Sequence, residues 1–210
     1  IETDSRKVPK GGLFVAIKGE RVDGHQFIDQ TIESGALAVM TEEDLGPRPF
    51  PYILVHSTLQ AMKDVAEFYL QQLHIPVVGI VGSVGKTSTK EMTYSVLSRK
   101  YQTLKTEGNF NNELGLPITI FRLRSNHELA VLEMGISNFG EMHRLAKVAR
   151  PNTVIMTNIG CCHLENLIDR DGILKAKSEV FDFIQPDAHI IINGDDDKLA
   201  TITDVRGIKP

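Results

Sequence analysis

The segment at residues 77–90, VVGIVGSVGKTSTK, constrains the fold more than any other part of the sequence. Five residues dominated by Val and Ile come first, a glycine-containing turn follows, and a helix is expected from about residue 87 to 98. A strand that passes through a glycine turn into a helix forms the first half of a βα unit. Because such units assemble into parallel sheets covered by helices, the segment predicts an α/β fold.

The sequence after residue 76 continues this alternation of strands and helices. Strands are expected at 77–81, 129–134, 153–157 and 189–193, and helices at 87–98, 139–148 and 171–184. In open parallel sheets, ligands bind beyond the carboxyl ends of the strands. Polar residues gather in the loops after these strands, at 82–87, 133–138, 158–165 and 193–197. One site at that edge of the sheet is therefore expected.

The first part of the chain has the pattern of a smaller α/β unit. Short apolar runs lie at 12–17, 36–41 and 52–56, with a helix expected at 27–34. From Leu59 to Leu73, apolar residues recur at helical spacing, and Pro76 ends that helix. We therefore predict two domains, a small α/β domain at 1–75 and a larger domain with a mostly parallel sheet at 76–210.

Composition excludes several classes of protein. With 210 residues, 41% hydrophobic and 24% charged, the chain has the composition of a globular protein, and its net charge of −4 argues against nucleic-acid binding. No apolar run is long enough to cross a bilayer, and the adjacent Cys161 and Cys162 would form only a strained disulfide. A cytoplasmic monomer is expected. Because the sequence does not begin with Met, we expect a piece of a longer protein whose second domain is incomplete.

The loop at 82–87 has the residues of a phosphate-binding site. Gly82 and Gly85 let backbone N–H groups approach phosphate oxygens, Lys86 would contact the terminal phosphates, and the Thr87 hydroxyl would bind Mg²⁺. The general pattern G-x-x-x-x-G-K-[ST] requires a glycine where Ile80 stands, so the pattern is only partly met. The alternative is a glycine turn without a ligand.

Three further residues at the same sheet edge are candidates. Glu133 ends a strand and could share Mg²⁺ with Thr87, although strand-end carboxylates are also often simply solvated. His163 follows strand 153–157, but a single histidine is commonly structural. Lys177 falls within the apolar stripe of helix 171–184. Because an unpaired buried ammonium is costly, Lys177 must reach solvent, find an anion or be modified.

Six segments together resemble the Mur ligases of bacterial peptidoglycan synthesis, and the resemblance spans nearly the whole chain. They are DSRKVPKGGLFVAIKGERVDGHQFI at 4–28, VGSVGKTSTKEM at 81–92, GNFNNELGLP at 108–117, EMGISNFGEM at 133–142, TNIGCCHLENL at 157–167 and AKSEVF at 176–181. The chain departs from the family pattern at Val81, Ser88, the ISNF segment and the two cysteines. The NFNNELG segment favours the branch that adds D-alanyl-D-alanine to a UDP-N-acetylmuramoyl tripeptide.

The resemblance implies a site for ATP, two Mg²⁺ ions and the sugar-nucleotide substrate. ATP would contact the loop residues Gly82, Ser83, Val84, Gly85, Lys86, Thr87 and Ser88. Mg²⁺ would be bound by Thr87, Glu133, His163 and a carbamylated Lys177. The catalytic residues would be Lys86, His163 and Lys177. The UDP-muramoyl peptide would contact Ser5, Arg6 and Asn112, with the loop at 19–25 beside them.

The implied activity is ATP-dependent amide formation through an acyl phosphate, completed by a further C-terminal domain. Two related alternatives remain, a Mur ligase that adds a diamino acid and a ligase similar to cyanophycin synthetase. Two unrelated ones are a P-loop kinase or NTPase and a catalytically silent nucleotide-binding module. The kinase alternative gives Lys177 no role and requires no sugar-nucleotide domain.

Overall fold

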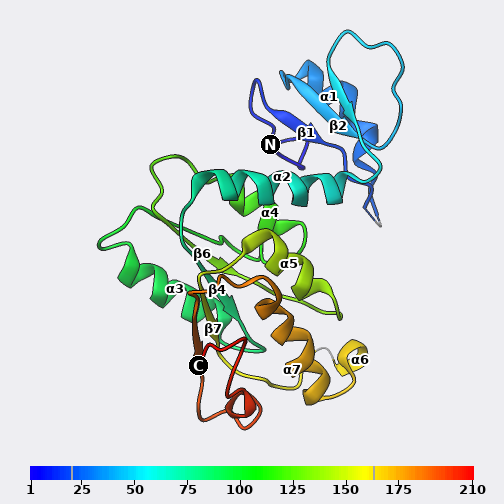
Figure 1. Cartoon of the computed structure of the whole chain (residues 1–210). Helices are drawn as coiled ribbons and strands as arrows, with labels where there is room; N and C mark the ends of the chain where they lie inside the picture. Colours follow the sequence, from blue (N-terminus) through cyan, green and yellow to red (C-terminus); the bar gives the residue numbers. More distant parts are fainter. Residues whose placement is uncertain (20, 163) are drawn as a thin grey trace. The chain divides into compact units, whose positions relative to one another are not determined.

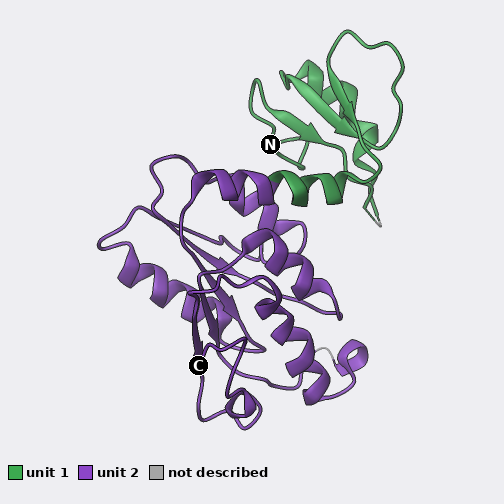
Figure 2. Ribbon diagram, viewed as in Figure 1, with its two compact units in different colours: residues 1–65 green, residues 66–210 purple. Residues whose placement is uncertain are grey.

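The computed structural model describes residues 1–19, 21–162 and 164–210 (Figure 1). The chain divides into two compact units, Ile1–Val65 and Ala66–Pro210, shown in Figure 2. The division falls inside the long helix α2 (Thr58–Leu73), whereas the sequence placed the domain boundary at 75/76. Since one helix belongs to both units, the boundary at 75/76 stays a prediction.

The first unit is a three-stranded parallel sheet in the order β1-β2-β3. Its strands are β1 (Leu13–Val15), β2 (Ala38–Thr41) and β3 (Tyr52–Leu54), with a 3₁₀ turn η1 (Gly24–Phe27) and helix α1 (Ile28–Glu33) between the first two. Phe14 and Val39 from the sheet pack with Ile28 from α1 in a small core. The α/β unit expected near the N-terminus is confirmed, with shorter strands than the sequence suggested.

The second unit is a five-stranded parallel sheet in the order β5-β6-β4-β7-β8. The strands are β4 (Val77–Val81), β5 (Thr103–Lys105), β6 (Leu129–Glu133), β7 (Thr153–Met156) and β8 (His189–Ile192). The helices are α3 (Lys86–Leu97), α4 (Gly115–Ile120), α5 (Glu141–Ala149), α6 (Leu164–Leu167), α7 (Arg170–Ser178), η2 (Glu179–Phe183) and η3 (Leu199–Thr201). The predicted α/β fold with a parallel sheet is confirmed.

The strand register brings the polar loops to one edge of this sheet. Ile80 of β4 is level with Glu133 of β6, and Met156 of β7 is level with both Val81 and Ile192. All five residues of β4 are buried, as expected for the central strand of a sheet. The phosphate loop therefore starts from the middle of the carboxyl edge, with the loops after β6 and β7 on either side.

Helix α5 packs against α7 and η2 on one side of the sheet (Figure 1). Its buried residues, among them Met142 and Leu145, join Ile173 and Val180 in the largest apolar cluster. The helix expected at 171–184 is shorter than predicted, because regular α-helix ends at Ser178 and the chain continues as a 3₁₀ turn. Across the described residues, no helix combines the length and apolarity needed to cross a membrane.

Candidate functional site

The phosphate loop leaves β4 through two glycines with unusual backbone angles. Gly82 has φ of 152°, and Gly85 has φ of 82° at the start of α3. No side chain caps α3, so its first N–H groups lack acceptors and point out of the helix end, where its dipole is positive. Such an arrangement suits phosphate oxygens.

Lys86 and Ser83 supply further groups to the loop. The Lys86 Nζ donates to the backbone oxygens of Gly82 at 3.0 Å and Ser83 at 3.3 Å, so the ammonium lies over its own loop. The Ser83 hydroxyl is buried and has no hydrogen-bond partner within the described part of the chain. Both side chains are thus close enough to the loop to contact an anion bound there.

The residues that directly follow β7 hold the phosphate loop in place. The Thr157 hydroxyl donates to the Val84 oxygen at 2.6 Å, and the Val84 N–H donates to Asn158 Oδ1 at 2.9 Å. The Ser83 N–H donates to the Asn158 backbone oxygen at 3.0 Å. A Cβ on Gly82 would lie only 1.9 Å from the Thr157 hydroxyl oxygen. The sequence assigned no role to Thr157 or Asn158, because neutral polar residues after a strand are common.

Glu133 is a buried carboxylate at this edge, and only 2% of the residue is exposed. Its Oε2 accepts from the Thr87 hydroxyl at 3.0 Å, and its Oε1 accepts from the Asn111 side-chain amide at 2.8 Å. Its backbone N–H donates to the Thr106 hydroxyl at 3.0 Å. Burial and these three bonds distinguish it from the solvated strand-end carboxylate that the sequence also allowed. Asn111 and Thr106 were not predicted.

The contact between Thr87 and Glu133 fits a divalent cation. A hydroxyl and a carboxylate, both hard oxygen ligands, lie side by side next to the phosphate loop, which is the donor set that Mg²⁺ prefers. The pairing of these two residues, which the sequence suggested from their positions alone, is present as a direct hydrogen bond. Their role in metal binding is taken up as a proposal below.

Lys177 is buried on the packed face of α7, with 1% of the residue exposed. Burial lowers the pKa of its ammonium to about 8; the charge of Cys162 opposes this shift and that of Lys86 adds to it. An amine that is partly neutral near physiological pH can react as a nucleophile, so the residue fits covalent modification.

The remaining predicted residues have mixed outcomes. His163 lies outside the described residues, so its role stays a prediction. The Asn112 side chain accepts from the Gly115 N–H at 2.8 Å and thereby supports the start of α4. Asn112 also lines a cavity of about 230 Å³ with Phe110 and Leu114.

In the first unit, Ser5 and Arg6 line a cavity of about 630 Å³ together with Val22 and Gly24 of the predicted substrate loop. Arg6 makes two bonds of 2.9 Å to the Asp4 carboxylate, and this contact holds the pKa of Asp4 well below its usual range. The three predicted parts of the sugar-nucleotide site in this unit therefore border one cavity.

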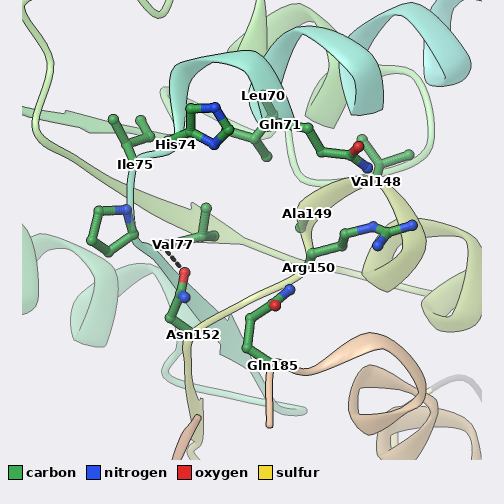
Figure 3. Close-up of a pocket in the computed structure, with 11 residues that line it drawn as sticks. Leu70, Gln71, His74, Ile75, Val77, Val148, Ala149, Arg150, Asn152 and Gln185 are labelled. Atoms are coloured by element: carbon green, nitrogen blue, oxygen red, sulfur yellow. Dashed lines mark hydrogen bonds between the residues drawn. The ribbon is translucent and has the colours of Figure 1, made fainter. Parts of the chain in front are cut away.

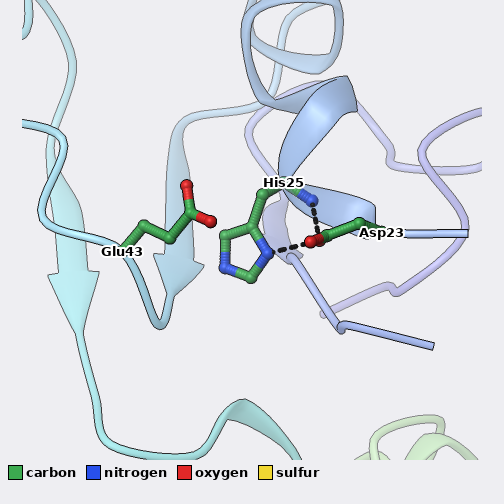
Figure 4. Close-up of side chains that lie close together, drawn as sticks. All are labelled: Asp23, His25 and Glu43. Atoms are coloured by element: carbon green, nitrogen blue, oxygen red, sulfur yellow. Dashed lines mark hydrogen bonds and ion pairs between the residues drawn. The ribbon is translucent and has the colours of Figure 1, made fainter. Parts of the chain in front are cut away.

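A cluster of Asp23, His25 and Glu43 in the first unit has donor atoms within 4.8 Å of one another (Figure 4). The His25 Nδ1 lies 2.6 Å from Asp23 Oδ1, and its Nε2 accepts the Glu42 N–H at 3.0 Å. Because both ring nitrogens are engaged, no lone pair remains for a metal. The histidine instead ties the loop before η1 to the end of β2.

A further cavity, of about 470 Å³, lies at the amino edge of the large sheet, opposite the phosphate loop (Figure 3). It is bordered by the ends of α2 and α5 and by Asn152, whose side chain accepts from the Val77 N–H at 2.9 Å. Arg150 at its rim is paired with Glu67 at 2.8 Å. This cavity is at the wrong edge of the sheet to take part in chemistry at the phosphate loop.

Fold and site together define an α/β protein with a phosphate-binding loop and an adjoining hydroxyl–carboxylate pair. Residues 1–80 match the family model "Mur ligase family, catalytic domain", and residues 80–209 match "Mur ligase middle domain". The chain therefore belongs to the Mur ligase family.

Individual relatives agree with this assignment. The chain is 43% identical over 198 residues to the UDP-N-acetylmuramoyl-tripeptide--D-alanyl-D-alanine ligase of Bacillus subtilis, a match of 93% of this chain and 43% of the relative. It is similar in structure to MurF from Acinetobacter baumannii, with a TM-score of 0.92 and 37% identity. The match covers 98% of this chain and 45% of that protein. It also resembles MurF from Thermotoga maritima in complex with ADP, with a TM-score of 0.88 and 36% identity. That match covers 95% of this chain and 47% of that protein. The chain thus spans less than half the length of these relatives.

Proposed function

We propose that this chain forms the UDP-muramoyl-peptide-binding and ATP-binding parts of a ligase that joins D-alanyl-D-alanine to UDP-N-acetylmuramoyl tripeptide. The observation that best supports this proposal is the hydrogen bond between Thr87 and Glu133. It lies beside the start of α3, which follows Gly85 and is not capped by a side chain. The similarity to the D-alanyl-D-alanine ligase of Bacillus subtilis supports the choice of substrates. We place the reaction in the cytoplasm, where ATP is available and Cys161 and Cys162 stay reduced.

The reaction has two steps. The terminal carboxylate of the tripeptide attacks the γ-phosphorus of ATP, which forms an acyl phosphate and releases ADP. The amine of D-alanyl-D-alanine then attacks the acyl carbon, and the collapse of the tetrahedral intermediate releases inorganic phosphate and gives the amide. The N–H groups at the start of α3 and the Lys86 ammonium would bind the phosphates and stabilise the charge on the transferred group.

Thr87 and Glu133 would hold one Mg²⁺, and His163 with a carbamylated Lys177 would hold a second. Bound Mg²⁺ supplies positive charge to the phosphate oxygens. Carbamylation joins the neutral Lys177 amine to carbon dioxide and releases one proton, which converts the side chain into an anionic oxygen ligand. Burial and a lowered pKa favour the neutral amine that this reaction needs.

Three residues are proposed to contact the sugar-nucleotide substrate. In the first unit, Ser5 and Arg6 border the cavity that we assign to the uridine diphosphate. To bind a phosphate oxygen, Arg6 would have to give up its contact with the Asp4 carboxylate. Both groups are anionic, so the phosphate can replace the carboxylate as the partner of the guanidinium. Asn112 would contribute beside its own cavity near α4.

The test measures phosphate release by the protein in its longest natural form, with ATP, Mg²⁺ and UDP-N-acetylmuramoyl tripeptide. Release should require D-alanyl-D-alanine, and Thr87→Ala should lower kcat by at least about 100-fold, because it removes a metal ligand. Ser95→Ala, an exposed hydroxyl further along α3 to which no role is assigned, is the matched control and should change kcat less than about fivefold. Release only with a diamino acid would assign the chain to another branch of the family.

A further inference from the structure

Helix α3 buries a lysine where an apolar residue would be expected. Of its residues Lys86–Leu97, all within the described part of the chain, Lys90 alone is buried, with 1% exposed. Meanwhile Met92 and Val96 on the same helix are 70% and 71% exposed. Because burying an ammonium is costly unless it is paired, the position calls for a specific partner.

That partner is Glu133, the carboxylate beside the phosphate loop. The Lys90 Nζ lies 3.8 Å from Glu133 Oε2, the oxygen that also accepts from the Thr87 hydroxyl. Thr87 and Lys90 are three residues apart on α3 and therefore lie on the same face of the helix. One carboxylate oxygen is thus shared between the predicted cation ligand and a fixed ammonium.

Lys90 also contacts Glu91, with 3.1 Å between Nζ and Oε1, and Glu91 in turn pairs with Lys105. The four charges form a row from the surface to the interior: Lys105, Glu91, Lys90 and Glu133. The Glu91 side chain is 46% exposed, whereas the Glu133 side chain is 3% exposed. Solvent screens the outer contact between Lys90 and Glu91, whereas both side chains of the inner contact between Lys90 and Glu133 are shielded from solvent.

We propose that Lys90 is a positioning residue that holds the Glu133 carboxylate when no cation is bound and competes with the cation for that carboxylate. The inference rests on the proposed function, because it takes the Thr87–Glu133 pair as the cation site. The row of charges is balanced, two positive and two negative. A divalent cation would place further positive charge close to the Lys90 ammonium, so Lys90 sets how tightly the ion can bind.

The first experiment tests the pair without any metal. Thermal melting in EDTA is compared for wild type, Lys90→Met, Glu133→Gln and the double variant. Lys90→Met leaves the buried Glu133 carboxylate without its cation, and Glu133→Gln leaves the buried Lys90 with the half-exposed Glu91 alone, so each change should lower the Tm by about 5 °C. The double variant should lose less than the sum of the two, because neither charge remains. Additive losses would show that Lys90 and Glu133 do not interact and would overturn the inference.

The second experiment measures Mn²⁺, a paramagnetic substitute for Mg²⁺, bound by the ADP-saturated chain in electron paramagnetic resonance titrations. Lys90→Met should tighten Mn²⁺ binding about tenfold, because a nearby positive charge is lost. Lys90→Arg should bind Mn²⁺ as wild type does. Glu91→Gln, a change at a half-exposed residue, leaves Lys90 with Glu133 alone and should weaken binding about twofold to threefold. Lys100→Met is the control for net charge.

The outcomes separate the inference from the function it rests on. If wild type binds Mn²⁺ but Lys90→Met binds it equally or more weakly, the competition is wrong while the cation site stands. If wild type binds no Mn²⁺ with ADP, both the cation site and the competition fail. Should Lys90→Met not fold, Glu91→Gln decides, because unchanged or tighter binding by that variant contradicts the inference.

Discussion

Among single residues, Lys177 has the surroundings with the clearest chemical consequence. Burial lowers the pKa of its ammonium from 10.5 to about 8, so between these two pH values the unfolded chain binds more protons than the folded one. The free energy of unfolding therefore rises with pH across this window. Below pH 8 both states carry the proton, and the cost of burying it is constant.

We predict that Lys177→Met removes this rise. Wild type should gain about 3 kcal/mol between pH 8 and 10.5 relative to the variant, from a shift of about 2.5 pKa units. Urea unfolding in buffers free of carbon dioxide measures the difference. Lys175→Met, an exposed lysine on the same helix, should keep the wild-type slope. If the free energy of unfolding changed equally with pH in wild type and Lys177→Met, burial would not hold Lys177 partly neutral.

Substitutions of the neighbouring Asn111 and Asn112 should affect different properties, namely metal binding and stability. Asn111→Ala leaves the buried Glu133 Oε1 without its donor and should weaken Mn²⁺ binding with ADP about tenfold. Asn112→Ala removes the acceptor for the Gly115 N–H and should cost about 1 kcal/mol of stability with metal binding unchanged. Metal titration and urea unfolding on both variants check this pair. A comparable loss of Mn²⁺ affinity in Asn112→Ala would contradict the assignment.

At the residue scale, sequence reasoning found residues that belong to a motif or stand at an unusual position, and it missed polar residues at ordinary positions. Glu133 and Lys177 were identifiable because a strand-end carboxylate and a lysine in an apolar stripe are unusual. Asn111, Thr157 and Asn158 are small polar residues in loops, and only the folded backbone brings them to the site. Lys90 was missed because its helix has no strong apolar stripe to mark a buried position.

At the scale of elements, the phosphate loop depends on close contact with the end of β7. We predict that Gly82→Ala displaces the loop, since its Cβ would lie 1.9 Å from the Thr157 hydroxyl oxygen, and weakens ADP binding at least about 100-fold. Gly85→Ala meets no atom within 4 Å and suffers only the strain of its positive φ, about 1 kcal/mol. Calorimetric titration with ADP compares them. Partial rescue of Gly82→Ala by Thr157→Ala would identify the contact, and equal losses for both glycine variants would contradict it.

Elements with strong apolar patterns were predicted within a few residues, and weak ones were missed. The central strand β4 has both faces buried and reads as a continuous apolar run. Strand β5 has three half-buried residues at the edge of the sheet, and α4 contains Gly115 and Pro117, two poor helix formers. Both elements exist because tertiary contacts override local propensity.

At the scale of the second unit, one side of the sheet presents an apolar surface. Met92, Val96 and Ile191 are 70%, 71% and 51% exposed and border a cavity of about 720 Å³ that also includes Val78 and Ile155. Exposed apolar surface of this kind binds hydrophobic dyes and promotes association.

Replacing Met92 and Val96 by Gln and Ile191 by Thr should lower the fluorescence of bound anilinonaphthalene sulfonate by about half or more. Each change should alter the free energy of unfolding by less than about 0.5 kcal/mol, because the side chains are already largely in water. Dye titration and urea unfolding measure the two quantities. Unchanged dye binding in the triple variant would place the apolar surface elsewhere on the molecule.

The strand order of the large sheet has a consequence for biosynthesis. Strand β4 pairs only with β6 and β7, both of which come later in the sequence. A ribosome must therefore complete Leu129–Glu133 before β4, all of whose residues are buried in the folded sheet, can pair with a neighbouring strand. Until then Val77–Val81 is unpaired and exposed, so chaperones and other nascent chains can bind it. The strand that leads into the phosphate loop is thus open to misassembly during synthesis.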